Sequence, residues 1–238
     1  MVAMVYNSAY YKMKNILKPL MLVLIPFLLF SCKNEGINGE KSDLTVADSC
    51  GNTYSTVKIA DQVWMAENLR ADKDAQGIAI DETQICNPNN DEANVPVFGK
   101  LYSWEAAQNV CPEGWRLPTK DEAKTLINTM GDADIAGAKL SGEQSLWNNL
   151  ADGKNTVPEH FGEGLFNAVP AGYLYNQEYY GFGYNTSFWC STLDDSENAQ
   201  KLQDPEKKVY AITLSYNDAK VGAIDRNFGL SVRCVKEN

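Results

Sequence analysis

The stretch Cys111-Pro-Glu-Gly-Trp-Arg-Leu-Pro-Thr119, which continues into Lys120-Asp-Glu-Ala, decides how this chain folds. The pair Thr119 and Glu122 is a capping box, in which each side chain binds a backbone N–H group at the start of a helix. The stretch therefore predicts a rigid turn that leads directly into a helix. One apolar stripe follows at helical spacing and makes that helix amphipathic: Ala123, Leu126, Ile127 and Met130.

Hydrophobic periodicity predicts further elements on both sides of this helix. Residues 54–69 predict a β-hairpin, and residues 101–110 predict a second short helix. Residues 210–235 hold three alternating runs, which predict a β-meander. Between these elements, residues 132–207 are rich in Gly, Asn and Asp and predict long loops. The pattern is that of a domain with two helices, a short antiparallel sheet and long loops.

The first thirty-one residues are typical of an export signal. Three lysines precede an apolar run of eleven residues, Leu20 to Phe30. This run is too short to span a bilayer, because a transmembrane helix needs about 20 apolar residues. A charged start before a short apolar core predicts a signal peptide over residues 1–31. Because Met13-Lys14 would also begin such a signal, residues 1–12 can be an upstream mis-start.

The end of this run, Leu29-Phe30-Ser31-Cys32, resembles the lipobox of bacterial lipoproteins. In that motif the cysteine is acylated and becomes the N-terminus of the mature protein. We therefore predict a lipidated Cys32, a flexible tether over residues 32–47 and a single domain over residues 48–238. Such a protein would be anchored to the bacterial cell envelope, in the outer membrane, on its periplasmic or surface face. The alternative is a cleaved signal that leaves Cys32 as an ordinary thiol.

The charge balance argues against one class of partner. The chain carries 21 Lys and Arg against 31 Asp and Glu, a formal net charge of −10. The signal peptide holds three of these lysines and no acidic residue, so the remainder carries −13. Nucleic-acid binding needs a basic surface that releases counterions, and the sequence offers no such cluster. We expect no nucleic-acid partner.

Cysteine and histidine counts limit the chemistry of the domain. Five cysteines follow Cys32, namely Cys50, Cys86, Cys111, Cys190 and Cys234. An odd number permits at most two bridges, and fifteen arrangements stay open. His160 is the only histidine, and no Cys-x-x-Cys pair accompanies it. We therefore expect neither a zinc site nor histidine-based catalysis, and we do not expect an enzyme.

Six ordered motifs carry a resemblance to a known family. They are Val63-Trp-Met-Ala-Glu-Asn-Leu69, Gly99-Lys-Leu-Tyr-Ser-Trp104, the stretch from Cys111 to Thr119, Ala171-Gly-Tyr173, Phe188-Trp189 and Gly229-Leu-Ser-Val-Arg-Cys-Val235. With them the chain resembles the FISUMP family, the Fibrobacter succinogenes major paralogous domain. Its members are typically exported bacterial proteins, often lipoproteins, of undetermined molecular role. The resemblance implies an α+β fold similar to C-type lectin-like and formylglycine-enzyme-like domains.

Within this family pattern, the motifs are best explained as scaffold. A bridge between Cys111 and Cys234 would tie the capped helix to the last strand. The family loop around Cys86 often holds a second cysteine, and serine is usual at Cys190, so the pairing of Cys50, Cys86 and Cys190 stays open. We expect two arginines, Arg116 and Arg233, to anchor salt bridges or loop carbonyls. Four tryptophans are expected in or near the core: Trp64, Trp104, Trp115 and Trp189.

An aromatic loop over residues 173–185 is the best candidate for a binding surface. Aromatic faces stack on sugars or on partner side chains, and amides and carboxylates bind hydroxyl groups. The alternative is that the rings fold back onto the core. The candidate ligand-binding residues are Tyr173, Tyr175, Asn176, Gln177, Tyr179, Tyr180 and Tyr184.

Two acidic pairs are weak candidates for a calcium site, Asp91 with Glu92 and Asp194 with Asp195. No other cofactor is expected. Taken together, the sequence predicts a lipid-anchored envelope module that binds a glycan or an envelope protein through its aromatic loop. The alternatives are a structural or adhesive component of the envelope and, less favoured, an enzyme of unknown type.

Overall fold

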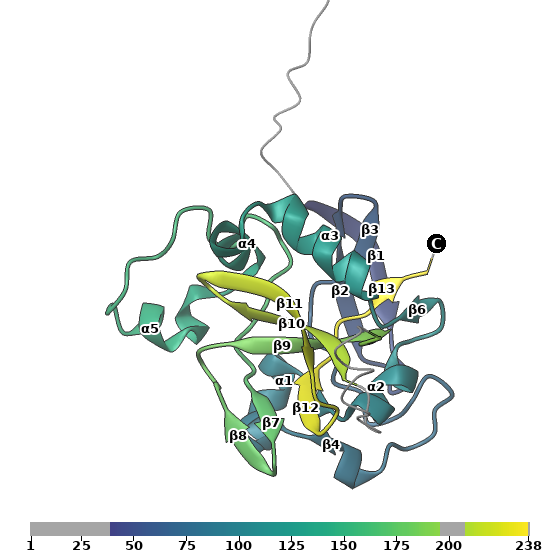
Figure 1. Cartoon of the computed structure of the whole chain (residues 1–238). Helices are drawn as coiled ribbons and strands as arrows, with labels where there is room; N and C mark the ends of the chain where they lie inside the picture. Colours follow the sequence, from purple (N-terminus) through teal and green to yellow (C-terminus); the bar gives the residue numbers. More distant parts are fainter. Residues whose placement is uncertain (1–38, 196–207, 238) are drawn as a thin grey trace, which may run out of the picture. The chain divides into compact units, whose positions relative to one another are not determined.

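The computed structural model describes residues 39–195 and 208–237 of the chain (Figure 1). The expected signal peptide, Cys32 and the first part of the expected tether lie outside these residues. Within the described ranges, no helix combines the length and the apolar character that a bilayer crossing requires.

One sheet has five strands in the order β1-β2-β3-β13-β6. They are β1 (Glu40–Ala47), β2 (Thr53–Ile59), β3 (Gln62–Met65), β13 (Val235–Lys236) and β6 (Trp115–Arg116). Strands β2 and β3 confirm the predicted hairpin, and Ala60 at its turn has a φ of 51°. Strand β13 lies between β3 and β6, where Val235 pairs with Trp64 on one side and Arg116 on the other.

Strand β1 corrects the predicted tether, because residues 40–47 belong to this sheet. Thr45 pairs with Ser55, and the Thr56 hydroxyl donates to the Leu44 carbonyl over 2.6 Å. Most β1 side chains are exposed, and Val46 is its buried residue. A strand stabilised by its backbone ladder, with one buried side chain, lacks the apolar alternation by which a strand is recognised in a sequence.

The second sheet has eight strands, six of them in the order β11-β10-β9-β12-β5-β4, with β7 attached to β12 and β8 attached to β7. Their bounds are β4 (Ile85–Cys86), β5 (Leu101–Tyr102), β7 (Tyr173–Tyr175), β8 (Glu178–Tyr180), β9 (Thr186–Leu193), β10 (Val209–Ser215), β11 (Asp218–Ile224) and β12 (Phe228–Ser231). The predicted meander is correct for β10 and β11. It is wrong for residues 230–235, which are divided between β12 in this sheet and β13 in the other.

More helices form than the two predicted. The capped helix α3 (Lys120–Met130) has both halves of its capping box. The other predicted helix begins later, as α2 (Trp104–Val110), because Leu101 and Tyr102 form β5. The expected long-loop region holds α4 (Ala133–Leu140), α5 (Asn148–Ala151) and strands β7 to β9. The remaining short helices are α1 (Val95–Phe98), η1 (Glu82–Gln84), η2 (Pro88–Asn90), η3 (Glu92–Asn94) and η4 (Gln144–Leu146). The fold class is α+β, as predicted.

The core lies between the sheets and the helices. The apolar stripe of α3 packs in one cluster with Trp64 of the first sheet and Phe188 of the second. Trp64 meets Phe166 edge to face, with ring centroids 5.8 Å apart. All four tryptophans expected in the core are buried there: Trp64, Trp104, Trp115 and Trp189.

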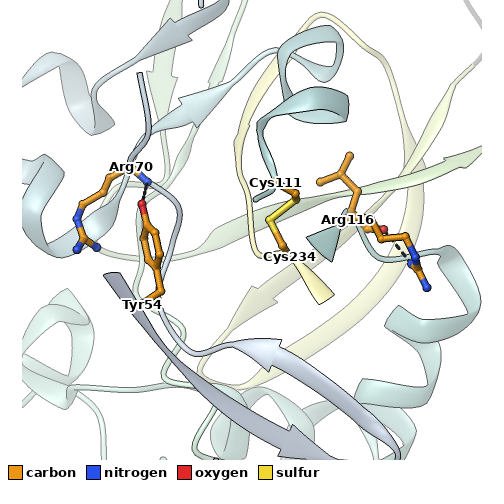
Figure 2. The surroundings of a disulfide bond; sticks show 6 residues. Tyr54, Arg70, Cys111, Arg116 and Cys234 are labelled. Carbon is orange, nitrogen blue, oxygen red and sulfur yellow. Dashed lines mark hydrogen bonds between the residues drawn. A yellow bond between two sulfur atoms is a disulfide. The ribbon is translucent and has the colours of Figure 1, made fainter. Parts of the chain in front are cut away.

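The Cys111–Cys234 disulfide is present and joins the end of α2 to the segment before β13 (Figure 2). Its two Cα atoms are 5.9 Å apart. Close to it, Arg116 binds Glu122 through both terminal nitrogens, over 2.8 and 2.7 Å. This bidentate pair connects β6 to the first turn of α3, as the sequence predicted for Arg116.

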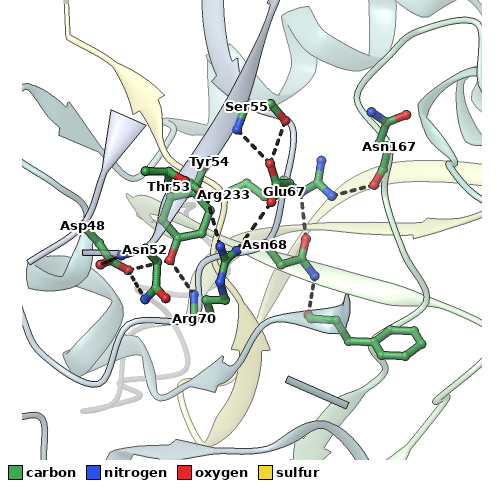
Figure 3. A network of polar contacts seen from close by, with 11 residues as sticks. Asp48, Asn52, Thr53, Tyr54, Ser55, Glu67, Asn68, Arg70, Asn167 and Arg233 are labelled. Atoms are coloured by element: carbon green, nitrogen blue, oxygen red, sulfur yellow. Dashed lines mark hydrogen bonds and ion pairs between the residues drawn. The ribbon is translucent and has the colours of Figure 1, made fainter. Parts of the chain in front are cut away.

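Arg233 is buried and acts as a loop anchor (Figure 3). Its guanidinium donates to the Asn68 side chain over 2.8 Å, to the Phe166 carbonyl and to the Asn167 carbonyl over 2.8 Å. The same group lies 4.4 Å from the centre of the Phe166 ring. Arg233 thus holds the 166–167 loop against the segment between β12 and β13, which explains why the predicted last strand is interrupted.

Candidate binding site

The predicted aromatic loop is a β-hairpin made of β7 and β8. Tyr173 pairs with Tyr180 and Tyr175 with Glu178, so the turn has two residues. These residues, Asn176 and Gln177, have φ values of 48° and 66°. Two consecutive left-handed residues are typical of a type I′ turn, whose twist matches that of a hairpin.

One face of the hairpin carries a row of aromatic rings, which we call the ring row. Tyr180 stacks on Tyr173 with centroids 5.6 Å apart, and Tyr175 stacks on Phe228 of β12 at 4.4 Å. Tyr173 and Phe228 join the two pairs, with centroids 5.7 Å apart. The row therefore runs Tyr180, Tyr173, Phe228, Tyr175. Tyr180 is the most open of these rings, with 40% of its surface exposed.

Tyr179 points to the opposite face of the hairpin. It packs with Leu174 in a small apolar cluster that includes Phe98 and Leu101. Cys86 packs against the same cluster. Burial raises the pKa of Tyr179 to about 12 and raises the pKa of the Cys86 thiol. The structure thus separates Tyr179 from the other candidate tyrosines of the hairpin.

The remaining candidate residues of the hairpin region lie outside the ring row. Asn176 and Gln177 are exposed at the hairpin turn, and the Asn227 amide donates to Asn176 over 3.5 Å. Tyr184 is 49% exposed and follows β8 outside the ring row.

A groove of about 220 Å³ adjoins the ring row. Phe228 belongs to both, which makes the row and the groove one continuous surface. The apolar part of the lining is Ile85, Cys86, Leu101, Leu174, Phe228 and Gly229, and the polar part is Thr83, Gln84, Ser103, Glu105, Arg226 and Asn227. The Arg226 guanidinium lies 4.3 Å from the centre of the Trp104 ring, which orients this cation.

The groove residues come from η1, β4, β5, α2, β7 and β12, which are far apart in the sequence. Sequence reasoning missed all of them as site residues except Cys86, which entered as a bridge candidate. Phe228 stands directly before the Gly229 motif, and that position was the one available signal. A β-carbon on Gly229 would lie 3.0 Å from that of Leu174, so glycine permits the close packing of β7 on β12.

The acidic pairs proposed for calcium do not converge. The Asp91 side chain accepts the Ala93 N–H over 2.9 Å at the start of η3, and Glu92 is exposed. Asp194 is buried and accepts from the Tyr210 hydroxyl over 3.3 Å, while Asp195 is exposed. In the described ranges, no three His, Cys, Asp or Glu side chains gather where they would hold a metal ion.

Three described cysteines are free: Cys50 is exposed, Cys86 is half-buried and Cys190 is buried. Burial raises the pKa of Cys190 to about 12. His160 lies in an exposed turn, where Nδ1 is 2.9 Å from a Glu163 carboxylate oxygen. None of the residues that line the groove is a histidine.

The fold and this surface define an α+β domain in which an aromatic hairpin borders a small groove. The model of the Fibrobacter succinogenes major domain matches residues 57–236, and the chain belongs to this family. No curated protein and no solved structure matches the chain.

Proposed function

We propose that this protein is a lipid-anchored binding module of the bacterial cell envelope that recognises a glycan through the ring row and the groove. The observation that carries the proposal is the continuity of the two through Phe228. It places stacking surfaces beside hydrogen-bonding groups, which is the combination that a sugar requires. In this proposal the domain binds and does not catalyse, and it has no nucleic-acid partner.

The composition of the groove suits one sugar residue. Ile85 and Leu174 offer apolar surface for C–H groups, while Glu105 and Arg226 offer an acceptor and donors for hydroxyls. Ligand pockets usually measure about 300–1,000 Å³, so a groove of about 220 Å³ holds one ring-sized unit. The rest of a chain would lie along the ring row, beside Tyr180.

A glycan-array screen of the full-length protein, with and without calcium, tests this proposal. For any ligand found, Tyr180→Ala and Arg226→Ala are expected to weaken binding about tenfold or more, since base or sugar stacking and charged hydrogen bonds each contribute about 1–3 kcal/mol. Tyr184→Ala is the matched control, because this exposed tyrosine lies outside the ring row. Equal binding by all three variants would contradict the proposed site.

A second candidate function is a structural or adhesive role with an envelope protein as partner. It is favoured by the ring geometry, because Tyr173, Tyr175 and Phe228 stack on neighbouring rings and offer fewer free faces to a sugar. A negative glycan screen together with capture of an envelope protein that Tyr180→Ala abolishes would favour this role.

The anchoring and the fold relationship belong to the same proposal. Lipidation at Cys32 and an outer-membrane location are supported by the signal and lipobox pattern. Mass spectrometry of the N-terminal peptide checks the first, and membrane fractionation checks the second. A relationship to C-type lectin-like domains is supported by the α+β architecture and the family membership.

A further inference from the structure

A polar hollow in two parts lies beside the Cys86 segment. The two parts measure about 430 and 450 Å³ and share the lining residues Asp72, Asn87 and Lys100. Lys100 forms an ion pair with Asp72 in this hollow. Cys50 lines one part and Cys86 lines the other. The two free thiols therefore line neighbouring parts of this hollow, although 35 residues lie between them in the sequence.

The chemistry of the free cysteines selects this pair. Cys190 is fully buried, with a pKa raised to about 12, and does not form a thiolate at neutral pH. Cys111 and Cys234 are already bridged. Among the described cysteines, only Cys50 and Cys86 have both a free thiol and access to solvent.

Cys50 lies in a short turn, and Cys86 lies in a two-residue strand at the edge of its sheet. Cys50 lies in the turn between β1 and β2, where its N–H binds the Asp48 carboxylate over 2.9 Å. Cys86 ends β4, and the next residues include Asn89 and Asn90, with φ values of 54° and 56°. An exposed turn and a short edge strand open at a lower free energy than core strands, so these two segments can approach one another.

We propose that Cys50 and Cys86 form a reversible disulfide that closes the polar hollow. The exposed Cys50 thiolate attacks an oxidised small-molecule disulfide such as glutathione disulfide, and one glutathione thiol leaves. The Cys86 thiolate then attacks the Cys50 sulfur of the mixed disulfide and expels the second glutathione. Two protein thiols are oxidised, one disulfide is reduced to two thiols, and the protons pass to the leaving groups.

The bridge would also act on the aromatic hairpin. Cys86 and Tyr179 pack against the same small apolar cluster, and β8 contacts η2 directly after Cys86. A Cys86 sulfur held by Cys50 would move away from this cluster. The hairpin would then lose one of the contacts that fix it, whatever its ligand is.

Peptide mapping of the full-length protein tests the bridge. The protein is treated with glutathione disulfide or with dithiothreitol, free thiols are alkylated in acid, and the chain is digested with trypsin without reduction. Cleavage after lysine gives residues 42–58, with Cys50, and residues 74–100, with Cys86. The expected result is a linked pair of these two peptides in the oxidised sample, which dithiothreitol removes.

Matched variants separate the alternatives. Cys190→Ser should leave the linked pair unchanged, whereas Cys50→Ser and Cys86→Ser should abolish it. A mixed glutathione disulfide on Cys50 with a Cys86 that is still alkylated would overturn the proposal, and so would a dimer linked through Cys50. Hydrogen exchange in residues 173–180 should increase on oxidation, as it should in Tyr179→Ala, which removes the packing of this ring on the cluster. Bridge formation without this increase would overturn the coupling to the hairpin.

Discussion

Arg233 places a full positive charge in the interior and gives it neutral oxygens as partners. It bonds to the Asn68 side chain and to the carbonyls of Phe166 and Asn167. Replacement by methionine would remove the donor from all three acceptors, two of which are buried. We expect Arg233→Met to lower the free energy of unfolding by about 3–5 kcal/mol.

Urea unfolding followed by tryptophan fluorescence measures this loss. Lys220→Ala is the control, because the Lys220 side chain is 66% exposed and its ion pair with Asp218 should contribute less than about 1 kcal/mol. A loss below about 1 kcal/mol in Arg233→Met would show that the 166–167 loop is held by packing instead of by the guanidinium.

Glu122 makes stability depend on pH. Hydrogen bonds from Arg116 first, and then from the Thr119 backbone and hydroxyl, lower its pKa to about 2. The folded state thus stabilises the ionised carboxylate relative to the unfolded state. The contribution of Glu122 to the free energy of unfolding is therefore complete above about pH 4.5 and is lost as the pH falls towards 2.

Glu122→Gln should cost about 1–3 kcal/mol at pH 7, and the difference from the wild type should shrink on acidification to pH 3. Urea midpoints at both pH values check this. A difference that stays constant with pH would contradict the assignment of the effect to the Glu122 charge.

At the scale of elements, the turn of the β7–β8 hairpin contains a residue that is not optimal. Gln177 has a φ of 66°, a conformation that costs a residue with a β-carbon about 1–2 kcal/mol. Asn-Gly is the preferred pair in such turns. Gln177→Gly should therefore slow amide exchange in residues 173–180, and Gln177→Val should accelerate it. The same exchange rates in both variants would show that packing on β12 alone fixes the hairpin.

The elements that could be predicted are those with a local cause. Helix α3 has its cap, its apolar stripe and Gly131 within one short segment, and β10 shows regular alternation. Strand β1 could not be predicted, because backbone pairing with β2 stabilises it and its mostly exposed side chains show no apolar alternation. The last strand was predicted as one run, since the alternation of residues 230–235 does not reveal that Arg233 turns inward.

For the whole molecule, the Cys111–Cys234 disulfide should be the largest single constraint. It closes a loop with a sequence separation of 123 residues. In the chain-entropy model, a loop of this size contributes roughly 4 to 5 kcal/mol. The double variant Cys111→Ala with Cys234→Ala should lose about that much in urea unfolding, and reductant should not destabilise it further. If reduction lowers the free energy of unfolding of the wild type by much less than this, the reduced unfolded chain keeps residual structure.

The candidate site is also a property of the whole molecule, which is why most of it escaped sequence reasoning. The tyrosines of the hairpin are contiguous and were predicted, whereas the groove assembles Gln84, Ser103 and Arg226 from three separate segments. Tyr179 points inward because side chains alternate between the two faces of strand β8. The sequence predicts a loop over residues 173–185, and a loop gives no such alternation.

The position of β13 determines when this protein can finish folding. The strand lies inside its sheet, between β3 and β6, and it is the last strand of the chain. The disulfide partner of Cys111 stands directly before it. During synthesis, β1, β2 and β3 can therefore pair with one another, but β3 lacks its neighbour β13 until residue 235 has emerged. Completion of the fold is therefore a late event, and an incomplete chain would expose the β3 edge to other chains.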